Sequence, residues 1–307
     1  MGIYLPIAEM SVNFLVLLAM GAAVGFLSGM FGVGGGFLIT PLLIFYNIPP
    51  AIAVATGANQ VIASSFSGAL AHFKRGTLDL KLGTVLLIGG IAGSSVGAFV
   101  FAFLRGIGQL DLVISLIYVV FLGTIGGLML VESVRAIRLS RSGVPPTLKK
   151  SGQHHWIHRL PLKMRFRTSK LFVSVIPVLA LGAAIGLLAA IMGVGGGIIM
   201  VPALIYLLKV PTNVVVGTSL FQIIFVAAYT TMVQATINST VDVVLALALM
   251  IGGVAGAQYG ARAGQKLRGE QLRALLALLV LAVALRLGFD LFATPASRYT
   301  ISGTRFL

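Results

Sequence analysis

Apolar runs of about 20 residues, the length an α-helix needs to cross the hydrocarbon core of a membrane, recur along this chain. Of its 307 residues, 58% are hydrophobic and only 9% are charged, and the mean hydropathy is +1.05. Soluble domains do not normally reach such values. The alternating apolar and polar pattern of a membrane β-barrel is not seen in the sequence. We therefore predict an all-α polytopic membrane protein.

The sequence contains an internal repeat. Gly21–Tyr46 (GAAVGFLSGMFGVGGGFLITPLLIFY) recurs 161 residues later as Gly182–Leu207 (GAAIGLLAAIMGVGGGIIMVPALIYL). The similarity continues in Thr56 and Gln60 against Thr218 and Gln222, and in Ile88–Ala98 against Ile251–Ala261. We predict a first transmembrane repeat over 1–135, a basic cytoplasmic linker over 136–170, a second transmembrane repeat over 171–295 and a C-terminal tail over 296–307.

Each half carries five apolar segments. They cover about 12–30, 36–47, 52–72, 82–104 and 110–134 in the first half, and about 171–191, 197–208, 213–235, 242–262 and 270–293 in the second. The second segment of each half has only 12 residues. A helix of that length spans about 18 Å, which is too short for a hydrocarbon core of about 30 Å. We therefore predict that this segment is a half-helix.

The positions of Lys and Arg in the loops predict the orientation of the chain. Ten of the 22 basic residues lie within 135–170, which places this linker in the cytoplasm. Counting helices from there, the basic loop at 74–81 faces inside, whereas its counterpart at 235–241 has no Lys or Arg and faces outside. The loop holding Arg105 faces outside, and its basic counterpart at 262–273 faces inside. This exchange of basic loops predicts inverted repeats, which are typical of secondary transporters. Both termini are then predicted to lie outside the cell. We expect the membrane to be a bacterial inner membrane.

The charge and composition argue against several other classes of function. The net charge of +15 would suggest nucleic acid as the partner of a soluble protein, but contact of the linker with the lipid bilayer explains it here, so we expect no nucleic acid partner. The chain has no cysteine, and His154, His155 and His158 have no carboxylate or thiol nearby, so we expect no metal. No paired acids or Ser/His pair lies at membrane depth, so we predict no cofactor, no catalytic residue and no enzyme activity.

Four glycines interrupt the apolar sequence FGVGGGFLITP (Phe31–Pro41), between a long segment and a half-helix. Backbone that leaves the helix at membrane depth must be buried in protein or line a cavity, so we predict the tip of a re-entrant hairpin. The unpaired amides and positive dipole at the start of the half-helix would favour an anion. With the second copy, the candidate substrate-binding glycines are Gly32, Gly34, Gly35 and Gly36 and Gly193, Gly195, Gly196 and Gly197. The alternative is that these glycines only allow helices to pack closely.

The third segment of each half carries a stripe of neutral polar residues, directly after the glycine hairpin. Such side chains can hold an oxyanion without burying a charge, but they also form hydrogen bonds between membrane helices, and both interpretations stay open. The candidates for substrate binding are Thr56, Asn59 and Gln60 in the first half and Thr218, Ser219 and Gln222 in the second; Ser64 and Ser67 continue the first stripe. Near the end of the last segment, Arg286 and Asp290 are predicted to pair with each other.

Two pairs of motifs resemble the sulfite exporter TauE/SafE family of membrane transporters. They are GMFGVGGGFLITPLL with ATGANQVIASSFSGALAHFKRG in the first half, and IMGVGGGIIMVPALIYLL with VGTSLFQ in the second. The resemblance covers about residues 12–293. It implies a secondary transporter of a small sulfur-containing anion such as sulfite, thiosulfate or an organosulfonate, whereas the residues alone imply only an anion. A passive anion channel is the alternative, and the direction of transport, the coupling ion and assembly into a homo-oligomer stay open.

Overall fold

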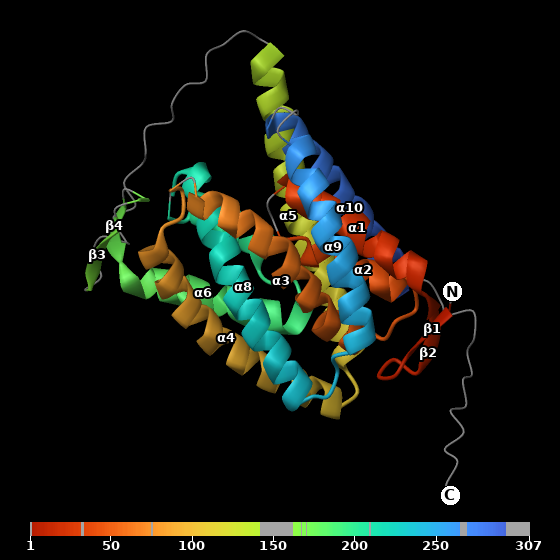
Figure 1. The fold of residues 1–307 in the computed structure, drawn as a ribbon. Helices are drawn as coiled ribbons and strands as arrows, with labels where there is room; N and C mark the ends of the chain where they lie inside the picture. The colour runs from red at the N-terminus through yellow and green to blue at the C-terminus, as the bar shows by residue number, and fades with distance from the viewer. Residues whose placement is uncertain are drawn as a thin grey trace, which may run out of the picture.

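In the computed structural model, residues 2–31, 34–74, 76–141, 162–166, 168–169, 171–208, 210–264 and 269–292 are described, and they form a helical protein (Figure 1). The first half contains α1 (Phe14–Phe31), α2 (Gly36–Phe45), α3 (Pro50–Lys74), α4 (Leu80–Gly106) and α5 (Leu110–Arg141). The second half contains α6 (Val175–Met192), α7 (Gly197–Tyr206), α8 (Thr212–Thr236), α9 (Val243–Gly264) and α10 (Gly269–Phe292). The predicted order of five helical segments in each half is confirmed.

The lengths of the helices fit a protein that crosses a membrane several times. Within the described residues, α4, α5, α6, α8, α9 and α10 are long and apolar enough to span it. The second helix of each half, α2 and α7, has only 10 residues. At about 1.5 Å per residue such a helix reaches about 15 Å, half the thickness of the hydrocarbon core. The polytopic all-α fold with two short helices is therefore as predicted.

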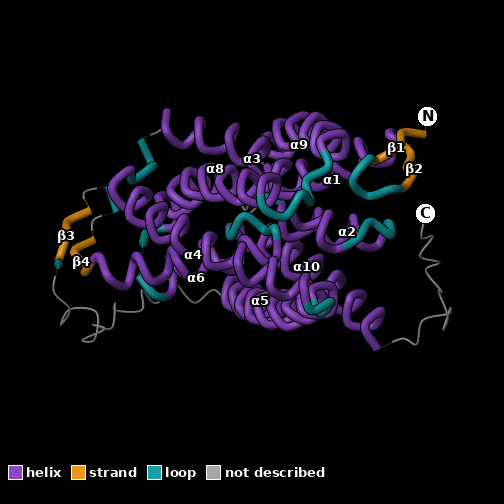
Figure 2. The backbone as a smooth tube through the Cα atoms, turned by 90° about the horizontal axis from the view of Figure 1, so that it is seen from below, coloured by secondary structure: helices purple, strands orange, loops and turns teal. Residues whose placement is uncertain are grey.

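The two halves are interleaved. Helix α1 packs along α9 of the other half, and α6 packs in the same way along α4. Helices α3 and α8 pack against each other, as do α5 and α10 (Figure 2). Each of these contacts joins a helix of the first half to a helix of the second, so the two halves form one interleaved helical bundle.

Glycines make the contacts of α1 with α9 and of α6 with α4 unusually close. A Cβ atom built on Gly25 would lie 2.2 Å from the carbonyl oxygen of Gly253, and one built on Gly93 would lie 1.9 Å from that of Ala183. Both distances are too short for a side chain, so the two backbones touch. The same holds along the stripes Gly21, Gly25, Gly29; Gly89, Gly93, Gly97; and Gly252, Gly256, Gly260. Their four-residue spacing predicts close helix packing, and the structure confirms it.

Two short antiparallel hairpins precede α1 and α6, and the sequence did not predict them. β1 (Gly2–Leu5) pairs with β2 (Met10–Asn13), and β3 (Lys163–Phe166) pairs with β4 (Leu171–Ser174). The hairpins lie at opposite ends of the molecule (Figures 1 and 2). Gly2 pairs with Asn13 in the first and Lys163 with Ser174 in the second, so the hairpins occupy equivalent places in the two halves.

Two elements of the fold extend into the range 136–170 that was predicted as the linker. Strand β3 begins at Lys163, inside that range. At the other end, α5 continues through Arg141, beyond the predicted end of the first repeat at 135. The change from apolar to basic composition marked these boundaries, but strands β3 and β4 are held by buried Phe166 and Val173 rather than by a long apolar run. His154, His155 and His158 lie outside the described residues.

Candidate functional site: two glycine tips that meet

The first glycine tip joins α1 to α2. Gly34 and Gly35 have φ angles of 84° and 72°, in the left-handed region that side chains disfavour. In the second half, Gly195 and Gly196 have φ angles of 67° and 78°, and Gly193 ends α6 with a φ angle of 69°. We call Gly34–Gly36 the first tip and Gly195–Gly197 the second tip. Their glycines are required because the chain turns sharply there inside the protein; Gly32 lies outside the described residues.

Both tips present the start of a helix without a side-chain cap. Gly35 is the N-cap of α2 and Gly196 is the N-cap of α7, and neither has a side chain that could accept a hydrogen bond from a helix amide. In α2, the amide of Leu38 already donates to the carbonyl of Gly35, and in α7 the amide of Ile199 donates to that of Gly196. The preceding amides, those of Gly36 and Phe37 and those of Gly197 and Ile198, are the ones that a helix leaves without an internal acceptor.

Neighbouring helices show how such amides are normally satisfied. Asp79 accepts the amide of Leu82 at the start of α4 at 3.2 Å, and Ser174 accepts that of Ile176 at the start of α6 at 3.3 Å. Gly36 and Gly197 are buried, so bulk water has little access to the amides at the two tips. A buried, uncapped N-terminus is costly, and together with the positive end of the helix dipole it favours an anion.

The structure brings the two tips into contact. A Cβ atom built on Gly36 would lie 2.6 Å from the carbonyl oxygen of Val194, which immediately precedes the second tip. Val61 and Ile223, at equivalent places on α3 and α8, fill the space beside the tips. A Cβ atom on Gly34 would lie 3.5 Å from Val61 Cγ1 and 3.8 Å from Ile223 Cδ1, and one on Gly195 would lie 2.6 Å and 3.1 Å from their Cγ atoms. The tips are closed in this arrangement.

Four of the predicted polar residues are engaged in the fold itself. Thr56 Oγ1 accepts the backbone amide of Asp242 at 3.1 Å, and Thr218 Oγ1 accepts that of Asp79 at the same distance. The remaining two bond within their own helices: Asn59 Nδ2 donates to the carbonyl of Thr56 at 3.3 Å, and Ser219 Oγ donates to that of Val216 at 3.0 Å. The two threonine contacts tie α3 to the start of α9 and α8 to the start of α4.

The other two predicted polar residues, Gln60 and Gln222, are fully buried. Within the described part of the chain, neither amide group has a hydrogen-bond partner. Gln60 lies against Gly253 of α9, and Gln222 lies in the equivalent place against Gly90 of α4. A buried amide without partners costs free energy, so the pair stands out from the polar residues that the fold uses.

Two buried acids tie the hairpins to the helices, and the sequence did not single them out. Asp242 accepts the amides of Val244 and Leu245 at 3.0 and 3.1 Å through Oδ1, and that of Ile7 in the first hairpin at 3.0 Å through Oδ2. Asp79 Oδ2 accepts the amide and hydroxyl of Ser169 in the second hairpin at 2.9 and 2.7 Å. Since Asp79 and Asp242 are equivalent in the repeat, alignment of the two halves was the signal that would have found them.

Tyr118 of α5 links the surroundings of both tips and was also missed. Its hydroxyl is fully buried and donates to the carbonyl of Met192, directly before Gly193, at 2.5 Å. The same hydroxyl lies beside Thr40 of α2. The equivalent stretch of α10 carries no tyrosine, so the repeat gave no signal for this contact.

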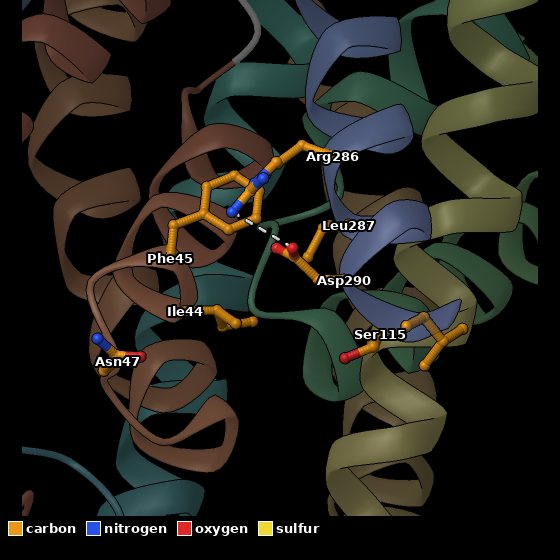
Figure 3. A pocket seen from close by; sticks show the side chains of 8 residues that line it. Ile44, Phe45, Asn47, Ser115, Arg286, Leu287 and Asp290 are labelled. Atoms are coloured by element: carbon orange, nitrogen blue, oxygen red, sulfur yellow. Dashed lines mark ion pairs between the residues drawn. The ribbon is translucent and has the colours of Figure 1, made fainter. Parts of the chain in front are cut away.

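A surface cavity of about 410 Å³ lies away from the tips, between the end of α2, α5 and α10 (Figure 3). Ile44, Phe45 and Asn47 line it from the α2 side, and Ser115 lines it from α5. Arg286 and Asp290 of α10 form an ion pair of 3.3 Å at its edge, as predicted. Because none of the predicted substrate-binding residues lines this cavity, we do not assign the substrate site to it.

Comparison with known proteins identifies the family. The model of a family described as sulfite exporter TauE/SafE matches residues 17–287, which include both tips and both polar stripes. The chain belongs to the sulfite exporter TauE/SafE family. It is therefore a multi-pass membrane transporter of this family.

Relatives of this TauE/SafE protein occur in bacteria and plants. The probable membrane transporter protein YunE of Bacillus subtilis is 27% identical over 91% of this chain and 98% of its own length. A probable membrane transporter protein of Xylella fastidiosa (strain 9a5c) is 27% identical over 89% and 94%. The sulfite exporter TauE/SafE family protein 1 of Arabidopsis thaliana is 34% identical over 29% of this chain and 20% of its own. No solved structure is significantly similar to the chain.

Proposed function

We propose that this protein is a secondary transporter that moves a sulfur-containing anion across the cell membrane. The anion is sulfite, thiosulfate or an organosulfonate, and it is held at the N-termini of α2 and α7. The observation that carries the proposal is the contact of two buried, uncapped helix N-termini at the two glycine tips. An anion satisfies amides that otherwise cost about 1–3 kcal/mol each when buried without a partner, and both helix dipoles favour it.

In this proposal the closed tips are one state of a transport cycle. Val61 and Ile223 fill the space beside the tips, so binding requires these side chains to move apart. Gln60 and Gln222 supply amide groups that the fold leaves unused in the described residues. Thr56 and Thr218 hold the helices that carry the site to their neighbours, and Asn59 and Ser219 bond within their own helices. The linker lies in the cytoplasm, both termini lie outside, and the protein has no enzyme activity.

Uptake by proteoliposomes tests the proposal. Purified protein in liposomes is expected to take up ³⁵S-labelled sulfite or thiosulfate at a rate that saturates with concentration, and to exchange it for unlabelled anion inside. Exchange against a gradient distinguishes a transporter from a passive channel, which carries no such counterflow. Failure to move any of the three sulfur anions, by protein that remains monodisperse, would refute the function.

A glycine substitution tests the site. In Gly196→Ala, a Cβ atom would lie 2.4 Å from Ile185 Cγ2, and the alanine must adopt a φ angle of 78°. The start of α7 must shift, so we expect uptake to fall at least tenfold. Gly108→Ala is the matched control, since Gly108 has a φ angle of 69° but open space around it. Equal uptake by the two variants would show that the tips are not part of the substrate-binding site.

A further inference from the structure

The two glycine tips have different surroundings although the halves are homologous. Ser28 of α1 and Ser65 of α3 face the first tip: a Cβ atom on Gly35 would lie 3.2 Å from Ser28 Oγ, and one on Gly34 would lie 3.1 Å from Ser65 Oγ. Ser64 Oγ donates to the carbonyl of Gly34 at 3.1 Å. All three serines are buried. The first tip therefore lies among three hydroxyl groups.

At the second tip, hydrocarbon side chains take the places of these three hydroxyl groups. The equivalents of Ser28, Ser64 and Ser65 in the second half are Ala189, Val226 and Ala227, which are all buried. A Cβ atom on Gly196 would meet Ile185 and Ala189, and one on Gly195 would meet Val61 and Ile223. At these three pairs of equivalent positions, hydroxyl groups are present in the first half only.

Among the three serines, Ser65 has a hydroxyl that the fold does not use. Its Oγ is fully buried and has no hydrogen-bond partner among the described residues. Ser64 is different, because its proton is already directed to the carbonyl oxygens of Gly34 and Val61, so it is a positioning residue that holds the first tip. A buried, unpartnered hydroxyl beside an uncapped helix start is an independent indication of a ligand with hydrogen-bond acceptors.

We propose that the site recognises the two ends of its anion differently, an inference that rests on the proposed function. The oxygens of an SO₃ group bind at the first tip, to the Ser65 hydroxyl and the amides of Gly36 and Phe37. The fourth position on sulfur faces Val61, Ile223 and the apolar second tip. In sulfite that position is a lone pair, in thiosulfate a sulfur atom and in a sulfonate a carbon atom. Helix α7 adds the positive potential of its dipole.

This arrangement disfavours sulfate. Sulfate carries four equivalent oxygens, so one of them always faces the second tip, where Ala227 replaces the hydroxyl of Ser65 and fewer hydrogen-bond donors replace the water that the oxygen loses. Such a site rejects an added polar group moderately, by up to about a hundredfold. The favoured substrate is therefore an SO₃-containing anion whose fourth substituent is not oxygen.

Competition for thiosulfate uptake in proteoliposomes tests this inference. Unlabelled methanesulfonate is expected to compete with ³⁵S-thiosulfate, and sulfate to compete at least tenfold more weakly. Ser65→Ala should raise the half-saturating thiosulfate concentration about tenfold. Ala227→Ser places a hydroxyl at the equivalent position of the second tip. It should lower the ratio by which methanesulfonate competes more strongly than sulfate. A hydroxyl with a purely structural role would leave that ratio unchanged. Ser65→Cys, which keeps the size of the side chain, serves if Ser65→Ala does not fold.

The outcomes separate this inference from the proposed function. If the wild-type protein moves no sulfur anion, both fail. If it transports thiosulfate and Gly196→Ala does not, but sulfate competes as well as methanesulfonate, only the inference fails. It also fails if neither Ser65→Ala nor Ser65→Cys changes the half-saturating concentration, or if Ala227→Ser leaves the ratio unchanged.

Discussion

Two replacements of Asp242, by asparagine and by alanine, are expected to lower the stability of the protein by different amounts. The carboxylate is fully buried; one oxygen caps α9 through two amides, and the other accepts the amide of Ile7 in the first hairpin. Asp242→Asn keeps an oxygen for the cap, because asparagine is as good an N-cap as aspartate, but it turns an NH₂ group toward the Ile7 amide. Asp242→Ala removes the cap and the hairpin contact together.

The expected magnitudes follow from these contacts. Asp242→Asn loses one hydrogen bond to a charged group, which lowers the free energy of unfolding by about 1.5–3 kcal/mol. Asp242→Ala also loses the helix cap, worth about 0.5–2 kcal/mol, so its total loss is about 2–5 kcal/mol. Asp79, the equivalent acid in the first half, is expected to show the same order, since it caps α4 and binds Ser169.

Unfolding of the purified protein in mixed detergent micelles measures these differences. The free energy of unfolding is expected to be highest for the wild type, lower for Asp242→Asn and lowest for Asp242→Ala. Asp290→Ala is the control, because the Asp290 side chain is 40% exposed and forms an exposed ion pair with Arg286, so its loss should change stability by less than about 1 kcal/mol. The reasoning is refuted if Asp242→Ala is as stable as this control, or if the asparagine and alanine variants are equally stable.

Three further predictions concern packing, the tips and the surface. Gly93→Val is expected to prevent α4 from packing on α6, since a Cβ atom would lie 1.9 Å from the carbonyl oxygen of Ala183, whereas Gly127→Val, in open space, should elute normally in size-exclusion chromatography. Tyr118→Phe should lower the free energy of unfolding by about 1–3 kcal/mol, because it leaves the buried carbonyl of Met192 without its donor, and a melting curve unchanged from wild type would contradict this. Arg286→Ala should leave thiosulfate uptake within twofold of wild type, because the Arg286–Asp290 pair lies at a surface cavity away from the tips. Loss of uptake would indicate that the substrate binds at that cavity and not at the tips.

The sequence predicted the helices well because their physical cause is local. The length of an apolar run determines whether a helix spans the membrane, and the αL geometry at Gly35 and Gly196 follows directly from glycines placed where a helix must restart. The two hairpins escaped prediction because each has only four residues per strand, and contacts made far along the chain hold them, such as that of Ile7 with Asp242.

The site was harder to predict because the sequence does not reveal which polar groups the fold uses. Thr56 and Gln60 look alike as members of one polar stripe, yet Thr56 accepts an amide from α9 whereas the amide of Gln60 has no partner in the described residues. The difference depends on residues almost two hundred positions away. The sequence did not single out Ser65, because this serine becomes notable only when it is compared with Ala227, the equivalent residue of the second half, which has no hydroxyl. The role of the tips in binding stays a prediction.

The interleaving of the halves sets the order in which the protein can be assembled during synthesis. Helix α6 follows its partner α4 with only α5, the linker and the second hairpin between them, so that pair can form as soon as Met192 has been made. Helix α1 enters the membrane first, but α9 begins only at Val243, after positions 32–242 have been made. The glycine face of α1 must therefore wait, covered by lipid or by the insertion machinery, until most of the chain is in place. Two contacts that are equivalent in the finished protein therefore form at different stages of its synthesis, one after Met192 and the other only after Gly264.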